Sequence, residues 1–307
     1  AQLPPKTVAC KDWIQQLQST DFTAERPYWE RIETAKVAPI PQDFAKKKNT
    51  MGTADTLSVS LSSSETTKLL KEVPQAYSVR IDDILLAALL LTFTSEKSPD
   101  IRISLEGHGR PEDQDLSRTV GWLTTLYPAL LSLPPAADRD LGTVIKSVKE
   151  TLRAVPNQGL GYGVLRYLQS TTSTSVSQSE TSAASTPIRF NYLGQTDQLF
   201  NTNSWLAPAT ESTGTARSPE DMRDILLEVN AVISRGQLTL HWTYSKALHQ
   251  PETISQWTTQ YLQHLSDLIQ HCLSIETDSG YSPADFPQMG LGQGELDDLL
   301  ASIGGEA

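Results

Sequence analysis

Two runs of alternating apolar residues constrain the fold of this 307-residue chain more than any other feature. Residues 227–233 and 238–244 each place an apolar side chain at every second position, and Arg235-Gly236 supplies a turn between them. Successive side chains of a strand point to opposite faces, so the pattern predicts a hairpin with one buried face. A helical period after Pro251 predicts a long helix that covers this face. Its expected inward-facing residues are Ile254, Trp257, Tyr261, Leu265, Leu268 and Cys272.

The remaining segments add strands and helices without a regular βαβ repeat. The predicted strands lie at 57–61, 101–105, 120–133 and 188–193, and the predicted helices at 10–34, 62 onward, 82–91, 140–153 and 295–303. This mixture predicts an α/β sandwich, with a sheet backed by helices, rather than a doubly wound sheet. Residues 36–56 have the composition of a linker, and the Ser/Thr-rich stretch 170–186 that of a mobile surface loop.

Charge and composition exclude several classes of function. The net charge of −11 argues against nucleic-acid binding, which needs clustered Lys and Arg, and no apolar run is long enough to span a membrane. The 2 Cys and 5 His residues are scattered without ligand spacing, so we expect no metal site. Low Cys usage favours a reducing, cytoplasmic setting.

The segment Glu106-Gly107-His108-Gly109-Arg110 is the clearest candidate for chemistry. It follows a predicted strand and brings a carboxylate, an imidazole and a guanidinium within five residues. Glycines let the backbone turn close to a ligand, and a carboxylate whose pKa is tuned by burial and by Arg can transfer a proton at carbon. The alternative is an exposed, charged turn at the end of a strand.

A second glycine-rich segment runs from Gly159 through Gly161 and Tyr162 to Gly163. A phosphate-binding loop would need the G-x-G-x-x-G spacing between a strand and a helix. Here the spacing differs and a helix precedes the segment, so we expect a tight turn or a loop that passes close to a ligand.

Four stretches together resemble one family. They read EGHGR at 106–110, RTVGW at 118–122, VPNQGLGYG at 155–163 and FNYLGQ at 190–195. In order and spacing they are similar to the signature motifs of epimerization domains of nonribosomal peptide synthetases. Further similar stretches are LPPKT at 3–7, DDILL at 82–86 and SPADFP at 282–287, so the resemblance covers nearly the whole chain.

The resemblance implies a fold like chloramphenicol acetyltransferase, in which two lobes form a V around a tunnel. The family's N-terminal lobe carries an H-H-x-x-x-D-G motif, and this chain has no His-His pair. We therefore expect only the C-terminal lobe, a two-layer α/β sandwich. Its expected parts are an inter-lobe helical and linker segment at 1–56, the lobe at 57–288 and an acidic helix or linker at 289–307.

The resemblance also implies a cofactor-free epimerization. The substrate would be an L-aminoacyl or peptidyl thioester on the phosphopantetheine of a carrier protein, and other partners would be the second lobe and neighbouring synthetase domains. Glu106 would transfer the α-proton together with a His of the other lobe, so the chain alone is expected to be inactive. The residues expected to line the tunnel are His108, Arg110, Tyr162, Asn191 and Tyr192. The expected structural residues of the motifs are Gly107, Gly109, Gly159, Gly161, Gly163 and Trp122, and the glycines of 159–163 would shape the tunnel wall.

Two alternatives stay open. The chain could be a related condensation-type lobe, although such a lobe is not expected to carry EGHGR and FNYLGQ together. It could also be a half-domain that has lost catalysis and docks carrier or partner proteins.

Overall fold

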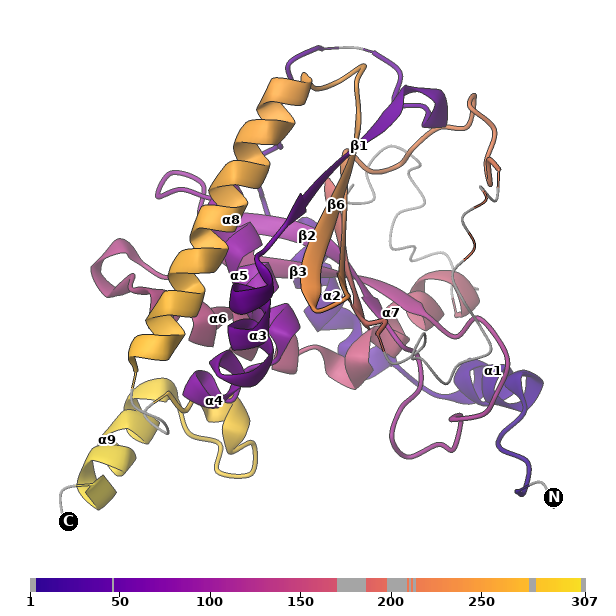
Figure 1. The fold of residues 1–307 in the computed structure, drawn as a ribbon. Helices are drawn as coiled ribbons and strands as arrows, with labels where there is room; N and C mark the ends of the chain where they lie inside the picture. The colour runs from indigo at the N-terminus through magenta and orange to yellow at the C-terminus, as the bar shows by residue number, and fades with distance from the viewer. Residues whose placement is uncertain are drawn as a thin grey trace.

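A six-stranded mixed sheet forms the centre of the computed structural model, which describes residues 4–45, 47–169, 186–197, 209, 211, 214–275 and 280–304. Its strand order is β1-β6-β5-β4-β2-β3 (Figure 1). Neighbouring strands pair antiparallel except β2 with β4 and β4 with β5, which are parallel. The strands are β1 Ala54–Ser60, β2 Asp100–Gly107, β3 Thr125–Ser132, β4 Ile188–Gln195, β5 Leu227–Ser234 and β6 Gln237–Ser245.

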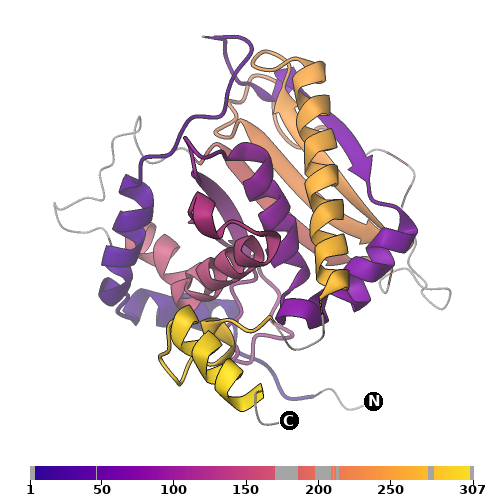
Figure 2. The same cartoon turned by 90° about the vertical axis from the view of Figure 1, so that its left-hand side faces the viewer.

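Helices cover most of one face of this sheet, and the helix at Arg26–Thr34 packs on the β2–β3 edge of the other face, where Arg102 donates to the Glu33 carbonyl at 2.7 Å. In Figure 2 the long helix α8 lies across the strands, beside α5 and α6. The helices are α1 Cys10–Ser19, α2 Arg26–Thr34, α3 Ser63–Lys71, α4 Val73–Tyr77, α5 Ile81–Phe93, α6 Leu141–Arg153, α7 Leu160–Gly163, α8 Pro251–Ser274 and α9 Gln293–Gly304. None of the helices in the described part of the chain has both the length and the hydropathy that a membrane span requires.

The predicted hairpin and its covering helix are confirmed as β5, β6 and α8. The apolar positions of both strands are buried against α5 and α8, and the ring centroids of Trp242 and Tyr261 lie 5.4 Å apart, edge to face. Tyr261 is fully buried and donates its hydroxyl to the carbonyl of Leu85 at 3.1 Å, which offsets the desolvation cost of that group. The helix-backed α/β sandwich is therefore confirmed.

Three segments differ from the prediction. The helix expected over 10–34 is two helices, because the chain turns at 20–25 and a second helix begins at Arg26, with Pro27 in its first turn. The stretch 36–56 is not a linker throughout, since a 3-10 turn forms at Met51–Thr53 and β1 begins at Ala54. The strand expected from 120 begins only at Thr125. The stretch 170–186 lies outside the described residues except for Thr186.

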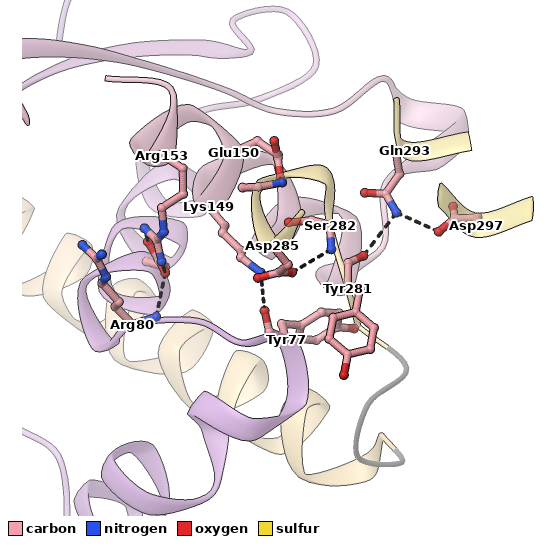
Figure 3. Close-up of polar contacts among 12 residues, drawn as sticks. Tyr77, Arg80, Lys149, Glu150, Arg153, Tyr281, Ser282, Asp285, Gln293 and Asp297 are labelled. Carbon is pink, nitrogen blue, oxygen red and sulfur yellow. Dashed lines mark hydrogen bonds and ion pairs between the residues drawn. The ribbon is translucent and has the colours of Figure 1, made fainter. Parts of the chain in front are cut away.

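Two buried ion pairs fasten α6 to its surroundings (Figure 3). Arg153 donates to both carboxylate oxygens of the fully buried Asp83, at 2.9 and 2.7 Å. Lys149, also buried, pairs with Asp285 at 2.5 Å, and Asp285 accepts the backbone N–H of Ser282 at 2.9 Å. The segment that leads to α9 is thus held against α6.

The buried His249 should make the protein less stable in mild acid. Its Nε2 lies 3.1 Å from the Pro41 carbonyl, and within the described structure its buried Nδ1 has no partner. Burial lowers the pKa of His249 below its ordinary value of 6.5, despite the opposing effects of the Pro41 carbonyl and Asp43. The unfolded chain therefore binds more protons below pH 6.5, and stability falls as the pH drops from 6.5 through the folded pKa.

The measurement is the free energy of unfolding of the chain by urea at pH 7.5 and pH 5.5. Burial also lowers the pKa of His264 and His271, so all three histidines should contribute to the acid-induced loss of stability. His249→Gln keeps a donor for the Pro41 carbonyl but cannot titrate, and it should reduce the loss by about 1 kcal/mol. An unchanged loss in this variant would contradict the assignment.

Candidate active site

The face of the sheet opposite α8 carries Glu106 beside Asn191. Glu106 lies near the end of β2, and the pairing of Leu105 with Phe190 sets Asn191 of β4 next to it. The Asn191 Nδ2 donates to Glu106 Oε2 at 3.0 Å. The structure therefore brings together the carboxylate of EGHGR and the amide of FNYLGQ, which are 85 residues apart in the sequence.

The Asn191 amide can position the Glu106 carboxylate to act as a base. Glu106 is exposed and Asn191 half-buried, so a substrate can reach the carboxylate from the open side of the sheet. The strand backbones are fixed by ladder hydrogen bonds, and the amide limits how the carboxylate can rotate. A carboxylate with a defined orientation can take a proton from carbon when the substrate is held within hydrogen-bond reach.

The rest of the EGHGR segment forms a braced loop. The Arg110 guanidinium donates to the carbonyls of Leu116 and Thr119, at 3.3 and 3.1 Å, and makes a long 3.5 Å contact with the carbonyl of His108. Its contacts are thus with its own loop, whereas the His108 side chain is exposed close to Glu106 in sequence. The bracing explains why β3 begins late, because residues 108–124 are folded back as a loop.

Gly109 cannot carry a side chain without moving this loop. Its φ is +62°, and a Cβ built there would lie 1.6 Å from the carbonyl oxygen of Leu123. Gly109→Ala should therefore lower the free energy of unfolding by about 2 kcal/mol or more, through left-handed backbone strain and the forced displacement.

Gly163→Ala is a matched control for this substitution. Gly163 has helical dihedrals, and a Cβ there would meet nothing within 4 Å. The substitution should be neutral or stabilise by up to about 1 kcal/mol, since Ala favours helix. Urea unfolding of the two variants compares them directly, and equal stabilities would show that the backbone of Leu123 leaves room for a side chain at position 109.

The segment 155–163 is a strained turn followed by a short helix. Asn157 and Gln158 have φ of 44° and 52°, and Gly159 has φ of 83° with no room for a Cβ against the Tyr127 ring. The turn is held by Glu25, which lies just before α2 and accepts bonds from Trp29 Nε1 at 2.8 Å and Asn157 Nδ2 at 2.6 Å. Gly161 also lacks room for a Cβ, against Glu25, and Gly107 lies against Thr125 and Gln158.

The structure does not bring the two predicted tyrosines to the Glu106 carboxylate. Tyr192 follows Asn191 and therefore points to the opposite, helix-covered face, where it packs against the core. The Tyr162 hydroxyl donates to Glu33 at 2.8 Å and accepts from Arg166 at 2.7 Å, and burial together with Glu33 raises its pKa. Both tunnel roles stay predictions.

Leu126 and Leu193 are apolar residues beside Glu106 and Asn191 that were not predicted from the sequence to belong to the site. Leu126 of β3 is the register partner of Glu106 and is 44% exposed, and Leu193 of β4 is 56% exposed. Val120 and Trp122, in the loop before β3, are 94% and 90% exposed. Trp122 therefore has no packing role among the described residues. Leu126 could be assigned to the site only from its pairing with Glu106, and that pairing requires the register of β2 and β3.

No group of three or more His, Cys, Asp or Glu side chains among the described residues could hold a metal ion. The groups that the described residues place together at the site are the Glu106 carboxylate and the Asn191 amide.

Comparisons with known proteins identify the relatives of this arrangement. A family model described as Condensation domain matches residues 1–286. The chain is 40% identical over 310 residues to a linear gramicidin synthase of Brevibacillus parabrevis, covering 97% of this chain and 4% of that protein. It is 37% identical over 322 residues to chondramide synthase cmdD of Chondromyces crocatus, covering 100% of this chain and 8% of that protein.

Among solved structures, the epimerization domain from the third module of tyrocidine synthetase B matches with a TM-score of 0.75 and 36% identity. The match covers 89% of this chain and 61% of that chain. A nonribosomal peptide synthetase cyclization-docking bidomain from Sorangium cellulosum matches with a TM-score of 0.60 at 15% identity, covering 88% and 54%, and shows the fold alone.

These matches define the class of protein as a domain of a nonribosomal peptide synthetase. The chain belongs to the condensation domain family. It spans less than a tenth of the two synthases and about three fifths of the solved epimerization domain.

Proposed function

We propose that this chain is the C-terminal lobe of an epimerization domain and takes part in converting an L-aminoacyl or peptidyl thioester to the D form. The observation that carries the proposal is the 3.0 Å hydrogen bond between Asn191 and Glu106. It joins two motifs that the resemblance assigns to one active site. The 36% identity to a solved epimerization domain over 89% of this chain supports the same choice.

In this proposal Glu106 accepts the α-proton and the Asn191 amide orients its carboxylate. A thioester carbonyl acidifies the neighbouring C–H, because the electron pair left on carbon delocalises onto the carbonyl oxygen. The carrier protein's phosphopantetheine supplies that thioester. Return of a proton to the opposite face of the planar carbon gives the D form, and return to the same face restores the L form.

The second proton-transfer group comes from outside the described residues in this proposal. Tyr192 lies on the helix-covered face of the sheet, so it cannot face Glu106 across a substrate. We assign the role to a His of the second lobe, as the family resemblance implies. The exposed Val120 and Trp122 fit a surface that such a lobe would cover, and the chain alone should then be inactive.

The alternatives lead to different products. A condensation-type lobe would join two carrier-bound substrates, and the family model that matches this chain is named for that reaction. A half-domain without catalysis would bind a carrier and change nothing on it. The presence of both Glu106 and its amide partner favours epimerization over either.

The test uses the complete domain that contains this lobe, given an L-aminoacyl thioester on its carrier protein. After hydrolysis of the thioester, chiral chromatography should show a mixture of the D and L amino acid, and this chain alone should leave it L. A product that stays entirely L with the complete domain would overturn the proposal.

A further inference from the structure

One line of polar residues continues from Glu106 across the face of the sheet opposite α8. Asn191 pairs with Asn230 of β5, Asn230 with His241 of β6, and His241 with Ser58 of β1. We call these five residues the polar row: Glu106, Asn191, Asn230, His241 and Ser58. They occupy neighbouring strands at one level of the sheet, so their side chains stand on the same face.

The fold does not account for the polar row. The helices α3, α5, α6 and α8 pack on the other face, where the strands are apolar. Glu106 and Ser58 are exposed and the three residues between them are half-buried. Hydrogen bonds join the row at both ends, since Asn191 bonds Glu106 at 3.0 Å and the Ser58 hydroxyl lies 2.8 Å from His241 Nδ1.

The row has a length and a chemistry that match an extended chain of amides. Four strand spacings separate Glu106 from Ser58, which is about 19 Å. An extended peptide of about six residues covers that length. Beyond Glu106 the row holds amide, imidazole and hydroxyl groups, which can both donate and accept hydrogen bonds.

The adjacent row on the same face differs in charge. This row lies two residues before the polar row along β4 and β5, and it includes Arg189 and Glu228. Arg189 pairs with Asp224 at 3.5 Å. Both charged groups already have partners in the protein, because Arg189 is paired with Asp224 and the Glu228 carboxylate accepts from Asn230 Nδ2 at 3.4 Å. The polar row, whose amide, imidazole and hydroxyl groups can donate and accept hydrogen bonds, is therefore the better path for an uncharged peptide.

We propose that the polar row binds the peptidyl portion of the substrate, which extends from the reacting residue at Glu106 past Asn230 and His241 toward Ser58. This rests on the proposed function and deepens it, because it makes the substrate a peptide and not only a single amino acid. The phosphopantetheine arm also carries amides, but it is common to all carrier-bound substrates. Effects confined to peptidyl substrates therefore distinguish the two sources.

The test measures binding, so that it does not depend on epimerization. The complete domain is titrated with fluorescent carrier protein that bears an amide-linked analogue, either tetrapeptidyl or aminoacyl. In the variant Asn230→Ala/His241→Ala the dissociation constant for the tetrapeptidyl carrier should rise about 10- to 100-fold, as two hydrogen-bonding groups are lost. The constant for the aminoacyl carrier should stay within about twofold, because a single residue at Glu106 does not reach β5 or β6.

Thr56→Val/Thr243→Val is the matched control. These residues lie on the same face of β1 and β6, in the adjacent row, and their hydroxyls are 2.9 Å apart. The control should bind both carriers as the unaltered domain does, and His241→Gln should keep part of the tetrapeptidyl affinity. If Asn230→Ala/His241→Ala weakens binding of both carriers equally, the row contacts the phosphopantetheine arm or supports folding. If it weakens binding of neither, the row takes no part in binding. Either outcome overturns the proposal.

The result of this binding test can be distinguished from the result of the epimerization test. Racemisation of the aminoacyl thioester is measured on its own by chiral chromatography. A domain that binds tetrapeptide through the row yet leaves its substrate L would support the row and contradict the epimerase.

Discussion

Replacing Glu106 with glutamine in the complete domain should lower the rate of α-proton exchange by about 100- to 10,000-fold, the usual contribution of a positioned acid or base. Glutamine keeps the shape of the side chain, and its amide oxygen can still accept the Asn191 Nδ2 bond seen at 3.0 Å. It cannot take up a proton from carbon. The exchange is followed by mass spectrometry of an L-aminoacyl carrier protein in deuterated buffer.

Two further variants separate chemistry from position. Asn191→Ala removes only the orienting amide, so it should slow exchange by about 10-fold, the equivalent of one hydrogen bond. Binding of the carrier protein should be the same in Glu106→Gln as in the unaltered domain, because glutamine keeps the size and shape of the side chain at the end of β2. Exchange that persists in Glu106→Gln within about threefold would remove Glu106 from the mechanism.

Replacing Arg153 with methionine should cost about 3–5 kcal/mol of unfolding free energy, because it leaves the fully buried Asp83 without its cation. Asp83 would keep only the backbone N–H of Arg80, which it accepts at 2.7 Å at the start of α5. Urea unfolding of the chain at pH 7 measures the loss.

The double variant Arg153→Met/Asp83→Asn is the control. Asparagine is uncharged and its side-chain oxygen can still accept the Arg80 N–H, so the double variant should recover most of the lost stability. A loss below about 1 kcal/mol would mean that the pair behaves like a surface salt bridge.

Local patterns were enough to predict the elements whose neighbours in space are also neighbours in sequence. The period-2 alternation of 227–244 predicts β5 and β6 because a hairpin needs only its own turn. The stripe on 140–153 predicts α6, whose buried residues follow it. The break between α1 and α2 also had a local signal, since Asp21 accepts bonds from the backbone and hydroxyl of Thr23 at 2.8 and 2.7 Å.

The candidate site depends on pairings that no local pattern predicts. β4 lies between β2 and β5 and is parallel to both, so the contact of Asn191 with Glu106 follows from strand order rather than sequence distance. Asn230 reaches the level of Asn191 through the non-local pairing of β4 with β5, whereas its pairing with His241 follows from the local hairpin. The motif resemblance associated Glu106 with Asn191, but it grouped Tyr192 with them, and the period of a strand puts that side chain on the other face.

One reaction tests the central claim, that this lobe serves epimerization. The complete domain is mixed in deuterated buffer with an L-aminoacyl donor carrier and an aminoacyl acceptor carrier, and mass spectra of both carriers are recorded over time. The account predicts deuterium at the α-carbon of the donor, abolished by Glu106→Gln, with no dipeptide on the acceptor. A dipeptide on the acceptor without label at the donor's α-carbon would contradict it and identify a condensation lobe instead.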